Sequence, residues 1–139
     1  MVLGSVGVVP IYWGSAWGKP PNDQLATQLD AFFDFIVTSS MIDMLAEYGI
    51  PGTPINHGTR LTSLRMTTSE PGSGGTVTDN QIRTQLQTWI DNGTVPKVTA
   101  NTLYFFYLRP NVTSVGPPGN GSSCSTFCGY HDAIGGTIF

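Results

Sequence analysis

The residues best suited to chemistry lie near the C-terminal end of the sequence, where His131 is followed by Asp132. This pair stands between a long loop and an apolar run, and functional sites collect at such strand ends in α/β folds. A histidine can act as a general base or a ligand, with a carboxylate orienting it. Nearby serines offer a nucleophile: Ser122, Ser123 and Ser125. The sequence therefore permits a small hydrolase complete in itself, although a single histidine without an assigned nucleophile is more often a structural or surface residue.

Two cysteines, Cys124 and Cys128, precede the histidine and are four positions apart in a loop. In a chain of extracellular character, a local disulfide is the favoured interpretation. A metal pair would need two more ligands, and only His131 is near in sequence. The spacing also differs from the Cys-x-x-Cys pattern of redox pairs, and two free thiols are the remaining alternative. We predict a disulfide, and no metal site is assigned to this chain.

Aromatic residues near the N-terminus offer a second kind of site. Tyr12, Trp13 and Trp17 could form a platform on which sugar rings stack, or could instead pack over the pair of helical segments within residues 22–49. His57, in a turn-rich segment, is a further candidate binding residue. The helical carboxylates are expected to face solvent and include no pair typical of a glycosidase: Asp30, Asp34, Asp43 and Glu47. A non-catalytic module that binds cell-wall glycan is therefore an alternative to a hydrolase.

The composition indicates a secreted protein. Charged residues make up 11% of the 139 residues, against roughly 25% in typical soluble domains, while 40% are hydrophobic. A net charge of −3, with scattered basic residues, argues against a nucleic-acid partner, and no apolar run is long enough to span a membrane. The N-terminus lacks the basic region of a signal peptide, so a signal would have been removed or lie outside this sequence. Three segments match the N-glycosylation pattern, which marks surface positions in a eukaryotic secretory protein: Asn92-Gly-Thr94, Asn111-Val-Thr113 and Asn120-Gly-Ser122.

The element that must position these residues is the uncharged, aromatic-rich run Thr102–Leu108. A short apolar run between breakers predicts a strand buried on both faces. Residues 6–13 predict a first strand, which Pro10 would place at an edge or at a bulge. A weaker edge strand is expected within residues 59–68, and residues 111–127 are expected to form a long loop.

Helical patterns flank these strands. Asn22 is expected to cap a helix with one apolar stripe: Leu25, Leu29, Phe32, Phe33 and Ile36. The pattern resumes after Ser39 and continues to Gly49, as a second helix or after a kink. Thr78 and Gln81 form a capping box for a further helix that ends before Gly93. The alternation predicts an α/β layered sandwich in one domain, with a mixed sheet of about four strands, Thr102–Leu108 central and helices packed on it.

The last seven residues, 133–139, read as an apolar strand within which the sequence ends. We expect the chain to be the N-terminal portion of a longer protein. An unpaired apolar strand at this end would also favour self-association.

Several stretches resemble a family of secreted bacterial and fungal zinc-peptidase-like proteins and, more distantly, the plant exordium-like (phosphate-induced) secreted proteins. The matching segments include Ile11-Tyr-Trp-Gly14, Phe32-Phe-Asp-Phe-Ile36, Tyr104-Phe-Phe-Tyr-Leu-Arg-Pro-Asn-Val112 and Phe127-Cys-Gly-Tyr-His131. The resemblance implies a zincin-like N-terminal subdomain whose last strand, residues 134–139, lies beside bound peptide. In that family a later helix carries a His-Glu motif, and this sequence ends at Phe139 before any such helix.

The leading interpretation is therefore the N-terminal portion of a secreted zinc-metallopeptidase-like hydrolase without its active-site helix. Zinc is expected only if a further C-terminal part is supplied. A peptide substrate follows from this interpretation, and a polysaccharide follows from the glycan-binding alternative.

Overall fold

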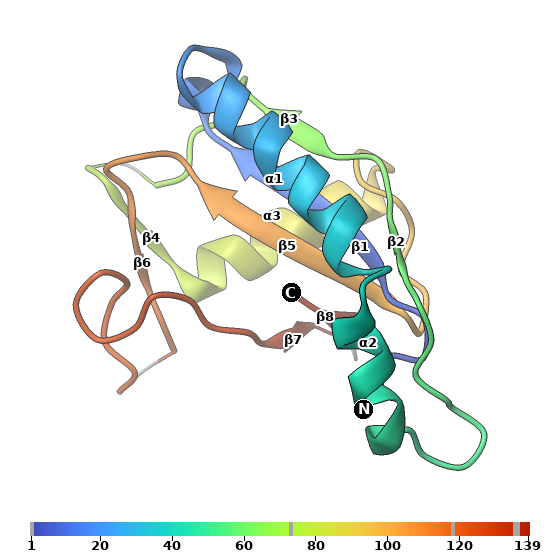
Figure 1. Ribbon diagram of the computed structural model, residues 1–139. Helices are drawn as coiled ribbons and strands as arrows, with labels where there is room; N and C mark the ends of the chain where they lie inside the picture. The colour runs from blue at the N-terminus through green and yellow to red at the C-terminus, as the bar shows by residue number, and fades with distance from the viewer. Residues whose placement is uncertain (1, 73, 118, 135–136) are drawn as a thin grey trace.

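Two parallel strands, β1 (Gly7–Trp13) and β5 (Thr102–Leu108), form the centre of the main sheet in a computed structural model (Figure 1). The model describes residues 2–72, 74–117, 119–134 and 137–139. The two strands pair without interruption from Gly7 opposite Thr102 to Trp13 opposite Leu108. The bounds of β5 match the predicted strand, and the α/β class with parallel strands is confirmed.

On the other side of β1 lie two short parallel strands, β2 (Thr59–Arg60) and β3 (Leu64–Met66), which confirm an edge strand in this region. β2 pairs with Gly7 and Val8, and β3 pairs with residues 11–13. Pro10 therefore lies opposite the gap between β2 and β3. No strand of the described chain pairs with it on that side, so the sheet loses no hydrogen bond through its lack of an N–H. The prediction that Pro10 would place β1 at an edge or a bulge is wrong, because the neighbouring strand is interrupted instead.

Among the described residues, a strand covers the far side of β5 only at its start. β8 (Thr137–Ile138) pairs in parallel with β5 at Leu103, and β7 (Ala133–Ile134) pairs antiparallel with β8. The main sheet therefore has the order β2-β1-β5-β8-β7, and β3 pairs with β1 on the same side as β2. It contains six strands, two more than the predicted number of about four.

Helices α1 (Asn22–Ile36) and α3 (Asp79–Asp91) lie on opposite faces of the sheet, as Figure 1 shows. On the α3 side, Val9, Ile11 and Trp13 pack with buried residues of that helix: Ile82, Leu86 and Trp89. On the α1 side the same strand presents Val8 to Phe33, and Tyr12 to Ala26. The alternation of a strand explains this division, because successive side chains point to opposite faces.

Of the two helix starts predicted from capping residues, one is confirmed and one is wrong. α3 begins with the predicted capping box: the Gln81 N–H donates to the Thr78 hydroxyl, and the Gln81 side chain accepts from the Thr78 N–H. α1 begins at Asn22, but the N-cap is Pro21, so Asn22 does not cap it. The second helical pattern is a separate element, α2 (Ser40–Met44), continued by the 3-10 turn η2 (Leu45–Tyr48).

A second small sheet pairs β4 (Thr76–Thr78), just before α3, with β6 (Thr113–Val115) in parallel. β6 lies inside the stretch expected to be a long loop. A strand of three residues shows too little alternation to be distinguished from a loop in the sequence. A further short 3-10 helix, η1 (Ser15–Gly18), follows β1.

A buried hydroxyl joins α1 to the sheet. The Tyr12 hydroxyl donates to Asp30 Oδ1 at 2.7 Å and lies 3.0 Å from the Ala26 carbonyl oxygen. Ser63, from the edge strand region, donates to the same Asp30 oxygen at 2.6 Å. Burial, and then the Asp30 carboxylate, raise the pKa of Tyr12 far above its ordinary value.

Replacing Tyr12 with Phe should lower the free energy of unfolding by about 1–2 kcal/mol, because Asp30 loses a partner in a half-buried position. Urea unfolding would measure the change. The matched control is Tyr48→Phe, since Tyr48 is 65% exposed and its variant should unfold like the parent.

The same variant should also be less sensitive to alkali. Because the pKa of Tyr12 is raised in the folded state, the stability that its hydroxyl contributes is fully present below about pH 10. This contribution is lost as the pH rises above that value. Equal losses of unfolding free energy between pH 8 and pH 11 in Tyr12→Phe and the parent would contradict the role given to this hydroxyl.

Candidate functional site

A cavity of about 680 Å³ runs along β5 on the side that β1 does not cover. Six consecutive residues of β5, from Leu103 to Leu108, line it. The facing wall is formed by residues of the segment after β6: Ser123, Cys124, Cys128, Gly129, Tyr130 and His131. Both faces of the strand contribute, so this β5 cavity follows the edge of the sheet.

The backbone of β5 turns unpaired groups toward this cavity. The Gly7 N–H donates to the Asn101 carbonyl, and the Arg109 N–H donates to the Trp13 carbonyl. In a parallel sheet, the backbone N–H and C=O groups of alternate residues bond to the same neighbouring strand. The odd-numbered residues of β5 therefore direct their backbone groups toward β1. The N–H and C=O groups of Phe106 and Leu108 therefore face the cavity. Among the described residues, no strand pairs with them, since β8 reaches only Leu103.

The facing wall is held in place by Arg83 of α3. Its Nε donates to Asp79 Oδ2 at 2.6 Å, one Nη donates to the Ala133 carbonyl at 2.8 Å, and the other contacts Asp132. The Arg83 guanidinium also lies 5.3 Å from the ring centroid of Phe139. One cation thus fixes the segment that forms the wall and the end of the β5 cavity.

Tyr130 extends the same network. Its hydroxyl donates to Asp79 Oδ1 at 3.0 Å, and Asp79 is buried at the start of α3. Burial, and then the Asp79 carboxylate, raise the pKa of Tyr130 well above its ordinary value. The hydroxyl therefore remains protonated at neutral pH and acts as a hydrogen-bond donor.

His131 lies on the wall of the β5 cavity and is exposed. The Asp132 carboxylate, which was expected to orient it, instead contacts Arg83 and accepts the Ala133 N–H at 2.7 Å. Across the described ranges, no hydrogen bond joins His131 to Asp132 or to a serine. Ser123 lines the same cavity, but its hydroxyl accepts the Ser114 N–H at 2.9 Å.

The two cysteines are free and exposed, so the predicted Cys124–Cys128 disulfide is not formed in this structure. The short turn between them is closed by the backbone, because the Cys124 N–H donates to the Phe127 carbonyl at 2.9 Å. Cys124 has a φ of 62°, which also sets the direction of its side chain.

The aromatic residues proposed for sugar stacking do not form an exposed platform. Tyr12, Trp13 and Trp17 are 0%, 3% and 4% exposed, and Trp13 faces the opposite side of the sheet from the other two. A stacking surface requires exposed rings, so these residues belong to the core instead. The alternative that they pack over the first pair of helices holds for Tyr12 and Trp17, which cluster with Ala26 of α1, but not for Trp13, which clusters with buried residues of α3. His57 is exposed and pairs with Asp43 at 2.8 Å, on a part of the surface outside the β5 cavity.

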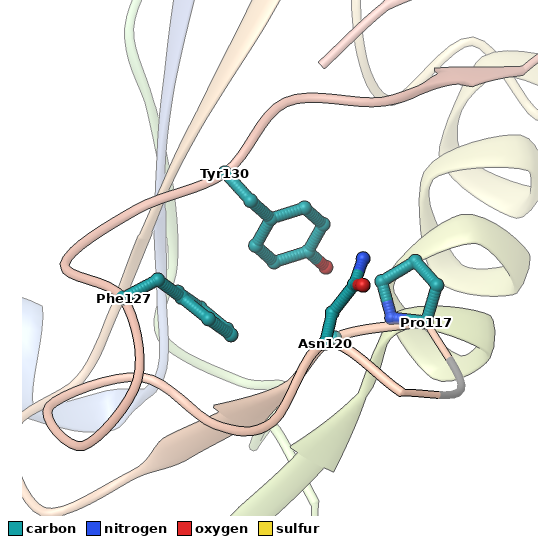
Figure 2. A pocket seen from close by; sticks show the side chains of 5 residues that line it. Pro117, Asn120, Phe127 and Tyr130 are labelled. Atoms are coloured by element: carbon teal, nitrogen blue, oxygen red, sulfur yellow. The ribbon is translucent and has the colours of Figure 1, made fainter.

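A second, smaller hollow of about 260 Å³ is lined by Gly116, Pro117, Asn120, Phe127 and Tyr130. Figure 2 shows the rings of Phe127 and Tyr130 on one side of this hollow and Pro117 on the other. The two rings meet edge to face, with centroids 5.4 Å apart. Tyr130 also lines the β5 cavity, so the two hollows share this side chain.

No protein-family model matches this chain, and comparisons with curated proteins and with solved structures give no significant match. In the ranges covered by the structure, no three His, Cys, Asp or Glu side chains lie where they could share a metal ion. None of the described helices is both long and apolar enough to cross a membrane.

The residues that organise this site were not identified from the sequence. Asp79 and Arg83 are spaced i, i+4 at the start of the helix predicted from the capping box, which is a recognisable ion-pair pattern. Their link to Tyr130 and Asp132 joins positions about fifty apart in the chain and needs the tertiary structure.

Replacing Arg83 with Met should lower the free energy of unfolding by about 1.5–3 kcal/mol, because Asp79 and Asp132 lose a charged partner while the aliphatic packing is kept. Amide hydrogen exchange should also accelerate in residues 130–134. Arg65→Met is the control, since within the described part of the chain the Arg65 guanidinium bonds only to Thr27 and a backbone carbonyl. Equal changes in unfolding free energy and hydrogen exchange in the two variants would contradict the anchoring role of Arg83.

Both thiols should react with a colorimetric disulfide reagent in the native protein, with two equivalents released per chain. The reaction should not require denaturant, because both residues are exposed. If the native protein shows no reactive thiol, and two thiols become reactive after reduction, the predicted disulfide is present after all.

Proposed function

We propose that this chain is the substrate-binding part of a secreted, peptidase-like hydrolase, and that it holds an extended polypeptide segment in the β5 cavity. The observation that carries the proposal is the edge of β5 at Phe106 and Leu108, which faces a cavity and pairs with no strand among the described residues.

An extended peptide offers what this edge lacks. A strand presents N–H and C=O groups at a spacing of about 3.3 Å per residue, so it can pair with both groups of Phe106 and of Leu108. Buried backbone groups without partners are costly, and pairing them supports binding. A polysaccharide has no such regular backbone of donors and acceptors.

The walls of the cavity favour apolar side chains on both faces of such a peptide. Tyr104, Phe106 and Leu108 lie toward α3, while Leu103, Phe105 and Tyr107 lie toward α1. Phe105 is 39% exposed, so this face of the strand is incompletely covered. A volume of about 680 Å³ also lies inside the roughly 300–1,000 Å³ range of ligand sites.

The proposal gives this chain binding and orientation, and no step is assigned to a metal. The described residues do not provide the three or more donors that a zinc site needs, so they do not fit the ion expected for a zinc peptidase. The zincin-like subdomain and secretion remain part of the proposal, supported by the sequence resemblance. Under this proposal, bond cleavage would require groups outside the described arrangement.

A second candidate, hydrolysis by this chain alone, has one observation in its favour: His131 and Ser123 line the same cavity. In that case His131→Ala would abolish turnover of a quenched fluorescent peptide while leaving the unfolding curve unchanged. Under the leading proposal, the isolated chain binds peptide without turning it over.

The leading proposal is tested with a soluble, alternating apolar peptide of six residues as the probe. Titration followed by amide NMR should perturb Phe106 and Leu108 most strongly, and their hydrogen exchange should slow at least tenfold on binding. Absence of binding at millimolar peptide, or perturbations confined to other elements, would reject the site.

The control uses two further probes with N-methyl groups on alternate amides, in the two possible phases. Methylation of the amides that face β5 should weaken binding about tenfold or more, since two hydrogen bonds of about 0.5–1.5 kcal/mol each are lost. Methylation in the other phase should have little effect. Equal affinities for both probes would exclude pairing through the backbone.

A further inference from the structure

The small hollow beside Asn120 combines two features that the proposed function does not use. Asn120 begins the segment Asn120-Gly121-Ser122, which matches the acceptor pattern for N-glycosylation. The same asparagine lines a hollow of about 260 Å³ with an edge-to-face aromatic pair. We propose that Asn120 is an N-glycosylation site and that the first sugar of its glycan packs in this hollow against Phe127 and Tyr130.

The position of Asn120 supports this proposal. The residue is exposed, and its carboxamide points into the space between Pro117 and the Tyr130 ring (Figure 2). Gly121 follows it with a φ of 76°, a left-handed backbone conformation that glycine adopts readily. The amide is therefore accessible to a modifying enzyme and already directed toward the hollow.

The hollow has the size and chemistry for one sugar ring. Its volume lies just below the roughly 300–1,000 Å³ that drug-sized ligands occupy, which corresponds to one ring rather than a chain of them. The C–H face of a pyranose is apolar, and aromatic side chains provide a large apolar surface at low cost in side-chain freedom. Phe127 and Tyr130 are both half-buried, so part of each ring remains available.

The three acceptor segments are not equivalent in the structure. Asn92 lies on an exposed turn after α3, where its Oδ1 accepts the Thr94 hydroxyl at 2.5 Å and the Thr94 N–H at 3.0 Å. A glycan on Asn92 would extend into solvent. In the third segment, Thr113 belongs to β6 and its N–H donates to the Gly75 carbonyl. Only the Asn120 segment adjoins the aromatic hollow, which makes Asn92 an internal control.

The modification is a group transfer from a lipid-linked oligosaccharide. The Asn120 Nδ2 forms the N-glycosidic bond to C1 of the first sugar, the bond between C1 and the lipid diphosphate breaks, and the amide nitrogen loses one proton. The inference rests on the proposed secretion, because this transfer takes place in a secretory compartment.

The packed sugar would brace the wall of the β5 cavity. Tyr130 lines both the small hollow and the β5 cavity, and its hydroxyl donates to Asp79. A sugar ring against Tyr130 and Phe127 would fill the hollow and restrict both rings. We therefore expect the glycan to increase thermal stability and not only to mark the surface.

The test produces the full chain in a eukaryotic secretory host and maps occupancy by mass spectrometry after enzymatic deglycosylation in heavy-oxygen water. Asn120 should be occupied, and Asn120→Gln and Ser122→Ala should each remove that glycan. An unoccupied Asn120 in a secreted chain with an occupied Asn92 would overturn the proposal.

The packing is tested on glycosylated protein by trimming. An endoglycosidase that leaves only the first sugar should preserve the increase in Tm, which we expect to be about 2–5 °C for a domain of this size. Complete removal, with Asn120→Asp as the matched protein, should abolish the increase. Trimming at Asn92, measured in the Asn120→Gln background, should leave Tm unchanged.

Phe127→Leu provides the second variant, since it keeps an apolar residue and removes the aromatic face. In this variant the difference in Tm between trimmed and fully deglycosylated protein should shrink to less than half. An undiminished difference would show that the sugar does not pack on Phe127. Peptide binding in the β5 cavity is measured on unglycosylated protein, so a failure there is distinguishable from a failure here.

Discussion

The parallel ladder between β1 and β5 is the constraint on which the rest of the structure depends. Its register runs unbroken over seven residues of each strand, so the side chains of both strands are assigned to the same two faces. Slipping the register by one residue would exchange the layers, placing Tyr12 under α3 and Trp13 under α1. The two helices could not then keep their contacts. On the α1 face the Tyr12 hydroxyl donates to Asp30, and on the α3 face Trp13 packs against Trp89.

The same ladder determines where a ligand can approach. Because odd-numbered residues of β5 bond to β1, the even-numbered ones direct their backbone groups toward the opposite side. The segment after β6 stands across from them as a wall and is tied to α3 through Arg83. The β5 cavity is therefore framed by a rigid strand on one side and an anchored loop on the other. If a peptide binds there as proposed, a site framed in this way would need little ordering of the protein.

Sequence reasoning succeeded where one local signal dominates. The bounds of β5 follow from an uncharged apolar run between breakers, and the start of α3 follows from a capping box that needs only four residues. It failed where distant residues decide the outcome. Pro10 is accommodated by a gap in a neighbouring strand fifty residues away, and the burial of Trp13 and Trp17 depends on two different helices. Asp132 was paired with His131 because they are adjacent, yet its partner is Arg83.

The interruption opposite Pro10 has a consequence for how copies of this protein could associate. A fibre that grows edge to edge needs two pairable edges on every copy. Here β2 and β3 are only two and three residues long, and β7 at the other end has two. Within the described ranges, β5 alone offers a longer free stretch. Contact through β5 would use the same edge of both copies, so assembly would end at a closed pair instead of propagating.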